Sequence, residues 1–152
     1  MTAPVVHKGY PQRVRLSRRP GFRLQQSYPG AIVVARPTRF GNPFTIGQVL
    51  LDQRSINVAA AQALCVTRFR LWLAGDPQGD RDVADALAGQ LTARRRVWIL
   101  DHLSDLTGRP LACWCPLPVF DEPDECHAAH LIHLANNTNH QGGKPNGLAT
   151  QG

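Results

Sequence analysis

The sequence predicts a small single domain of the α/β class, or of the α+β class, in which a few-stranded sheet packs with about four helices in the rough order β-β-α-α-β-α. Two observations favour this class. Short segments with strand-like apolar patterns are interleaved with longer segments whose apolar residues recur at helical spacing. The chain of 152 residues, 43% of them apolar, is long enough for one buried core. We expect residues 1–136 to form this domain and the polar, glycine-rich residues 137–152 to form a flexible tail.

Short segments in the first third and near the C-terminus have the patterns of strands. Residues 12–17 alternate between apolar and polar, which predicts a half-buried strand with Arg13 and Arg15 pointing outward. Residues 31–36 form a continuous, β-branched apolar run between turn residues, as in a buried strand. Residues 110–115 predict a third short strand, which a proline ends.

Helical patterns occupy the middle and the end of the domain. Residues 57–74 have the clearest one, because apolar residues recur on one face and Gly75 follows the last of them. We expect residues 80–106 to continue as helix in two pieces, broken near Gly89. Residues 125–136 predict the last helix.

Neither an export signal nor a membrane span is predicted. No apolar run approaches the roughly 20 residues that cross a bilayer, and the N-terminus lacks the apolar stretch of a signal peptide. We therefore expect a cytoplasmic protein without a membrane partner, in which cysteines are thiols or metal ligands more often than disulfides.

The positive charge is concentrated in the first third of the chain. The net charge is +6, and residues 1–54 hold nine lysines and arginines against one acid, Asp52. This asymmetry predicts an anionic ligand, either a nucleotide or a nucleic acid. The alternative is a solvated basic surface without a partner.

Four side chains near the C-terminus form the strongest candidate site: Cys113, Cys115, Cys126 and His127. In an extended segment, residues two apart point to the same face, so Cys113 and Cys115 share one side of the third strand. Cys126 and His127 open the last helix, whose N-terminal amides favour a thiolate. Thiolates and an imidazole together suit one tetrahedral zinc ion, either closed by four ligands or open at one position.

Other interpretations of these residues stay open at this stage. Cys113 and Cys115 can be small core hydrophobes, and a disulfide is a further alternative. Cys126 and His127 are also candidate catalytic residues, as a nucleophile and its base. In a catalytic zinc site, a nearby acid would carry protons, and the candidates are Asp121, Glu122 and Asp124.

The loop after the second predicted strand is a candidate ligand-binding site. In open α/β sheets, ligands bind in the loops at the carboxyl ends of the strands. Arginines offer forked donors to phosphate, a glycine allows a close approach of the backbone, and phenylalanines can flank a base. The alternative is ordinary turn chemistry around Gly-Asn-Pro. The candidate ligand-binding residues are Arg36, Arg39, Gly41, Asn42 and Phe44.

These motifs together resemble the DUF4326 family. The resemblance is carried by "RVRLSRRPGFRL", "AIVVARPTRFGNPF", "LACWCPL" and "CHAAHLIHLAN", which follow in the family's order between Arg13 and Asn136. Ala35 stands where a glycine is usual in the family. The resemblance implies an intracellular protein of bacteria or bacteriophages, with nucleotide or nucleic-acid chemistry, and names no reaction. The family's motif positions fall on Arg36, Pro37, Gly41, Asn42, Pro43, Phe44, Cys113, Cys115, Cys126, His127 and Asn136.

Two functions from different classes are therefore predicted. The first is an enzyme of nucleotide or modified-base chemistry, in which the residue 36–44 loop binds a phosphorylated ligand and the Cys/His cluster binds zinc or supplies a thiolate. The second is a non-catalytic module, stapled by zinc, that binds nucleic acid or a protein. The sequence determines neither the oligomeric state, nor the substrate, nor the order of the strands.

Overall fold

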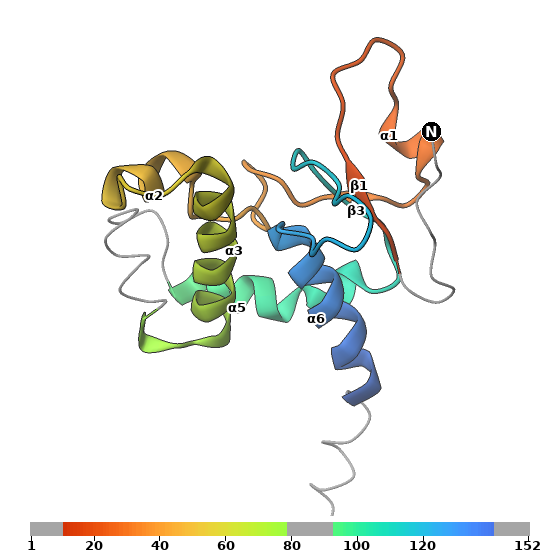
Figure 1. Cartoon of the computed structure of the whole chain (residues 1–152). Coiled ribbons are helices and arrows are strands. Elements are labelled where there is room, and N and C mark those ends of the chain that lie inside the picture. The colour runs from red at the N-terminus through yellow and green to blue at the C-terminus, as the bar shows by residue number, and fades with distance from the viewer. Residues whose placement is uncertain (1–10, 79–92, 142–152) are drawn as a thin grey trace, which may run out of the picture.

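Three short parallel strands form the sheet of this protein. The computed structural model describes residues 11–78 and 93–141. Strands β1 (Arg13–Arg15) and β2 (Ile32–Val33) both pair in parallel with β3 (Leu111–Cys113), so that β3 is central and the order is β1-β3-β2. The α/β class is confirmed, and the third strand lies beside the second. Because the pairing is parallel, all three strands end at the same edge of the sheet, and Figure 1 shows β1 and β3 side by side.

The helices surround this sheet and follow the predicted order, with two short additions. The predicted helices at 57–74 and 125–136 correspond to α3 and α6, and α6 continues to Gln141. Of the predicted helix at 80–106, residues 79–92 lie outside the described residues, as do residues 142–152 of the predicted tail. The helices are α1 (Leu24–Ser27), α2 (Ile46–Asp52), α3 (Val58–Ala74), α5 (Ala93–Asp101), the 3-10 helix η1 (Leu103–Leu106) and α6 (His127–Gln141).

Helix α3 is bounded by ordinary capping interactions. The Asn57 side chain accepts a hydrogen bond from the backbone N–H of Ala60 at 2.8 Å, which satisfies one free amide of the first turn. Gly75 ends the helix in the left-handed conformation, with φ of 80°. The buried face of α3 includes Phe69 and Trp72, each no more than 2% exposed. Stability of the helix therefore comes from this packed face together with the caps.

The core lies between the sheet, α3 and α6. Every residue of β3 is buried, because the central strand is covered on both faces. Helix α6 lies against β3 and η1, and its N-terminal end faces the carboxyl edge of the sheet (Figure 1). The packing therefore brings the start of α6 to the place where β3 ends.

One side-chain orientation in the first strand differs from prediction. Arg15 is exposed as expected, but Arg13 is only 8% exposed. The alternating pattern predicted the strand but assigned Arg13 to the solvent side, since an arginine is buried only where acceptors satisfy its guanidinium. Those acceptors lie more than 100 residues away in the chain.

Among the described residues, no helix is long and apolar enough to cross a membrane.

Candidate metal centre

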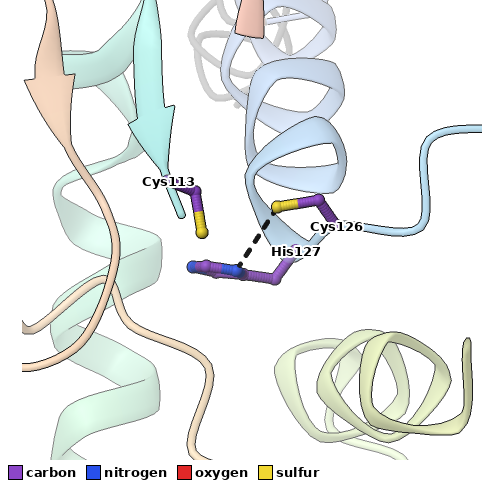
Figure 2. A group of neighbouring side chains, drawn as sticks. All are labelled: Cys113, Cys126 and His127. Carbon is purple, nitrogen blue, oxygen red and sulfur yellow. Dashed lines mark hydrogen bonds between the residues drawn. The ribbon is translucent and has the colours of Figure 1, made fainter. Parts of the chain in front are cut away.

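Two cysteines and a histidine meet where β3 ends and α6 begins. Cys113 is the last residue of β3, His127 the first of α6, and Cys126 precedes it. One ligand atom from each of these residues lies within 4.8 Å of the others, and all three side chains are buried. Figure 2 shows the three side chains pointing toward a common centre. Of the four predicted metal ligands, the fold brings these three together most closely.

The His127 ring is held in one orientation. Its Nε2 lies 2.8 Å from the backbone oxygen of Val34, which can only accept, so Nε2 carries the proton. The ring also packs edge-on against Phe69, with ring centres 5.3 Å apart. Nδ1 is left with its lone pair and faces the Cys126 Sγ at 3.9 Å. A metal-binding histidine is typically oriented in this way, with its second nitrogen bound to a carbonyl.

Cys115 lies beside this group of three. Its Sγ is 3.8 Å from the Cys113 Sγ, and its side chain is half-buried. Two thiolates on a tetrahedral zinc ion, with Zn–S distances of about 2.3 Å, lie about 3.8 Å apart, and a thiolate and an imidazole lie about 3.6 Å apart. The distance of 3.8 Å between the Cys113 and Cys115 sulfurs matches the first value, and the distance of 3.9 Å between the Cys126 Sγ and the His127 Nδ1 is slightly longer than the second. Cys65, Cys113, Cys115 and Cys126 are all free thiols.

The thiols of the cluster promote the ionisation of one member, Cys113, and oppose that of the others. Hydrogen bonds from Cys115 and Cys126 lower the pKa of the Cys113 thiol far below its usual value. The hydrogen bond with Cys113 in turn raises the pKa of Cys126, and burial adds to that shift. The cluster thus accommodates one thiolate readily and resists a second. A bound cation would remove that resistance, since it offsets the charges of the thiolates.

Arg13 fastens the loop that joins β3 to α6, which we call the β3 loop (residues 114–125). Its guanidinium donates to the backbone oxygens of Cys115, at 3.0 Å, and Pro116, and it forms an ion pair with Asp124. Burial alone lowers the pKa of Arg13, but the bond to Asp124 and the nearby Cys126 thiol outweigh it, and the pKa is raised. One side chain thereby holds both ends of the loop that joins Cys113 to Cys126.

A cleft of about 330 Å³ opens beside the cluster. Its walls come from β3, the start of α6, the face of α3 and the loop that follows β2, which we call the β2 loop (residues 34–45). Two charged side chains line it, Arg36 and Glu125, amid mostly apolar surface. The other lining residues are Ala35, Asn42, Phe44, Ile46, Gln62, Cys65, Val66, Cys113, Trp114, Cys115, Pro116, Cys126 and His127.

The predicted ligand-binding residues of the β2 loop also hold the loop itself together. Arg36 Nη1 donates to the backbone oxygens of Asn42, at 2.8 Å, and Phe44, at 3.2 Å. Asn42 accepts from the Phe44 N–H and donates to the backbone oxygen of Cys65. Gly41 packs so closely on Arg36 that an added Cβ would lie 2.9 Å from the Arg36 Cγ. Most hydrogen bonds of the Arg36 and Asn42 side chains therefore stabilise the loop itself.

The five predicted ligand-binding residues divide by position. Arg36, Asn42 and Phe44 line the cleft, but Phe44 is only 2% exposed. Gly41 is buried within the loop and is not a lining residue. Arg39 lies over the ring of Trp98 on α5, 5.2 Å from the ring centre, and is not part of the cleft.

Several cleft residues were not predicted from the sequence. The acid that lines the cleft is Glu125, whereas Asp124 is paired with Arg13. Gln62 reaches the cleft from α3 and donates to the backbone oxygen of Glu125 at 2.7 Å. The position of Glu125 directly before Cys126 was an available signal, because residues next to ligands commonly border the site.

His130, one turn into α6, lies outside the cluster. Its ring packs edge-on against Phe69 with centres 6.3 Å apart. Burial, with the nearby charges of Arg70 and His133, lowers the pKa of His130 to about 4. It is therefore a neutral, packed histidine at physiological pH.

The fold and the cluster define a small parallel α/β domain with a thiol–imidazole site at the carboxyl edge of its sheet. The chain belongs to the DUF4326 family, described as a domain of unknown function, whose family model matches residues 14–137. Searches of the curated proteins and of the solved structures found no match. The family's terminal asparagine has a structural role in this chain, because Asn136 accepts from the Gly108 N–H at 3.0 Å and donates to Ile132.

Proposed function

We propose that the protein binds a zinc ion through Cys113, Cys126 and His127 and uses the adjoining cleft to bind a phosphorylated, nucleotide-like ligand. The observation that carries the proposal is the meeting of three soft ligand atoms within 4.8 Å on the wall of the cleft. Zinc is the metal of choice because two thiolates and an imidazole favour it over ions that prefer oxygen ligands.

The cleft has the composition of a small-molecule site. Arg36 is exposed, and only its Nη1 is bound within the loop, so further N–H donors remain for an anionic group. The apolar side chains of Ile46, Val66 and Trp114 offer surface to a base or sugar. The ligand class is inferred from this pairing of a cation with apolar walls.

An enzyme of nucleotide or modified-base chemistry is the form of this proposal that we favour. Zinc with one open position supplies Lewis-acid chemistry and lowers the pKa of bound water. Glu125 is the acid that lines the cleft, so it is our candidate for carrying protons there. Cys126 does not suit the role of nucleophile, since it is 1% exposed and its pKa is raised.

The non-catalytic module remains a second candidate because of one observation. Cys115 lies 3.8 Å from Cys113, close enough to become a fourth ligand after a small movement. Three thiolates and an imidazole would close the site, and zinc would then staple the β3 loop. In that case the domain binds its ligand or partner without hydrolytic chemistry.

Metal content tests the proposal first. Protein purified without a histidine tag should contain about one zinc per chain, and Cys113→Ser and Cys126→Ser should lose it. Cys65→Ala is the matched control, because Cys65 is also a buried cleft cysteine but lies outside the metal group. Protein without zinc, or a Cys113→Ser variant that retains it in full, contradicts the proposal.

Cobalt substitution separates the two candidates. The thiolate-to-metal charge-transfer intensity counts bound thiolates, and the visible bands report coordination number. Cys115→Ser should leave the thiolate count unchanged in an open site and lower it by one in a closed site.

Titration with nucleoside phosphates then tests the ligand, with Arg36→Ala as the variant and Arg39→Ala as its control of equal charge. Thermal melting of both variants separates lost binding from a disturbed β2 loop.

A further inference from the structure

A second hollow, separate from the metal cleft, lies at the carboxyl end of β1. It is broad and open, with a volume of about 670 Å³. Its lining is Arg15, Leu16, Ser17, Arg18, Arg19, Phe22 and Trp114. We call it the basic groove, because three of these seven residues are arginines and none is acidic.

The arginines of the basic groove are available to an anion. Arg15, Arg18 and Arg19 are all exposed, and within the described part of the chain none forms an ion pair. Three uncompensated cations in one hollow attract a partner that carries several negative charges along its length. A single phosphate group would use only part of this surface.

An aromatic platform accompanies the charges. Trp114 is 44% exposed, and the Arg18 guanidinium lies over its ring at 5.0 Å from the ring centre. The ring and the guanidinium thus place an aromatic surface and N–H donors side by side. Such a combination of a basic groove and an exposed aromatic ring is typical of sites for single-stranded nucleic acid, where bases stack and phosphates pair with arginine.

Trp114 also connects the basic groove with the metal cleft. It follows Cys113 directly, and it lines both hollows. A strand that lies in the groove and stacks on Trp114 therefore has its next nucleotide at the mouth of the cleft. The two hollows therefore adjoin at this side chain.

From these contacts we propose that the basic groove binds single-stranded nucleic acid and directs one of its nucleotides toward the metal cleft. The groove part of the proposal stands independently, whereas entry into the cleft rests on the proposed function. Phosphates contact Arg15, Arg18 and Arg19, and a base stacks on Trp114. The ligand of the cleft is then a nucleotide within a strand and not a free nucleotide.

Binding of a fluorescent thymidine oligonucleotide of about 12 nucleotides to the zinc-loaded full chain tests the groove. Trp114→Ala should weaken binding about tenfold, since it removes one stacking surface, and Trp114→Phe should restore most of it. Arg18→Ala should weaken binding and reduce the slope of log affinity against log salt by about 0.7. Arg54→Ala removes an equal charge from the connection between α2 and α3, elements that Figure 1 shows on the other side of the molecule from α1 and β1, and should have little effect.

Three outcomes overturn the groove proposal: no binding of the oligonucleotide, equal losses in Arg18→Ala and Arg54→Ala, or equal affinity for a duplex of the same length. Arg36→Ala tests entry into the cleft separately. If the groove variants weaken binding and Arg36→Ala does not, the groove stands and the path into the cleft is wrong. A different outcome is that the oligonucleotide does not bind, whereas a free nucleotide binds with the same affinity to the groove variants as to the unchanged protein. The proposed function then stands and this inference fails.

Discussion

The β2 loop and the β3 loop leave neighbouring parallel strands at the same edge of the sheet, and an arginine from another element contacts each, yet only the β2 loop packs its own side chains into the core. The β2 loop is held from within by Arg36 and Asn42 and from α5 by Arg95, which donates to the backbone oxygens of Thr38, Arg39 and Gly41, and its Phe40 and Phe44 are buried in the core. The β3 loop is held at its ends by a residue from β1, and its middle is exposed, with Phe120 86% exposed. Polar residues in a motif can therefore build the frame of a site without contacting a ligand.

Zinc removal should produce the largest difference between the two loops. Binding at a thousandfold excess over the dissociation constant stabilises the folded state by about 4 kcal/mol, and chelation should remove this. Hydrogen exchange should then accelerate in the β3 loop, which joins the proposed ligands Cys113 and Cys126, and stay slow in the β2 loop. Equal changes in both loops would contradict a metal centre confined to the end of β3 and the start of α6.

Gly41→Ala should be the next largest change and should affect the β2 loop. The added Cβ would lie 2.9 Å from the Arg36 Cγ and 3.0 Å from its Cα, so backbone must shift. We expect a loss of about 2–3 kcal/mol in the free energy of unfolding, measured by urea denaturation.

Gly47→Ala is the matched control for that variant. A Cβ at Gly47, in α2, meets no atom within 4 Å. Because alanine is the better helix former, this change should stabilise the protein by up to about 1 kcal/mol. A destabilising Gly47→Ala, or a harmless Gly41→Ala, would show that the close packing on Arg36 does not constrain the β2 loop.

Arg13→Lys should follow, with an effect confined to the β3 loop. Lysine keeps the charge, but it lacks the planar fork that reaches Asp124 and two backbone oxygens together. We expect a loss of about 1–2 kcal/mol in unfolding free energy and weaker retention of zinc. Arg15→Lys, at an exposed position on the same strand, should change neither quantity. Equal stability of the two variants would show that the Arg13 guanidinium does not stabilise the β3 loop.

Phe120→Ser should have the smallest effect. The side chain is 86% exposed at the middle of the β3 loop, so little apolar contact is lost. The change in unfolding free energy should stay within about 0.5 kcal/mol, and zinc content should not change. A larger loss of stability would mean that the middle of the β3 loop is held in place as firmly as its ends.

The sequence predicted the parts of this molecule that local patterns encode. The helix at 57–74 and the strand at 31–36 were predicted because their apolar spacing is a property of neighbouring residues. The grouping of Cys113 with Cys126 and His127 followed from the predicted strand end and helix start. What the sequence did not predict depends on distant contacts.

The burial of Arg13 is the clearest case of such a contact. Its acceptors in the β3 loop are more than 100 residues away, so no local pattern could assign it to the interior. The short helices α1 and α2 were also missed, because four and seven residues carry too little periodicity to be recognised. Val58 has the spacing of the buried face of α3 but is 57% exposed, since it is the first residue of the helix.

The central place of β3 also has a consequence for synthesis of the protein. Among the described residues, β1 and β2 pair only with β3, so neither finds its partner until Leu111–Cys113 has left the ribosome. The 77 residues between Val33 and Leu111 take about 4–15 s to translate at ordinary rates. During that interval the nascent chain can form α2 and α3 but no sheet. A ribosome stalled before Leu111 should therefore carry a chain that is helical, protease-sensitive and open to chaperones.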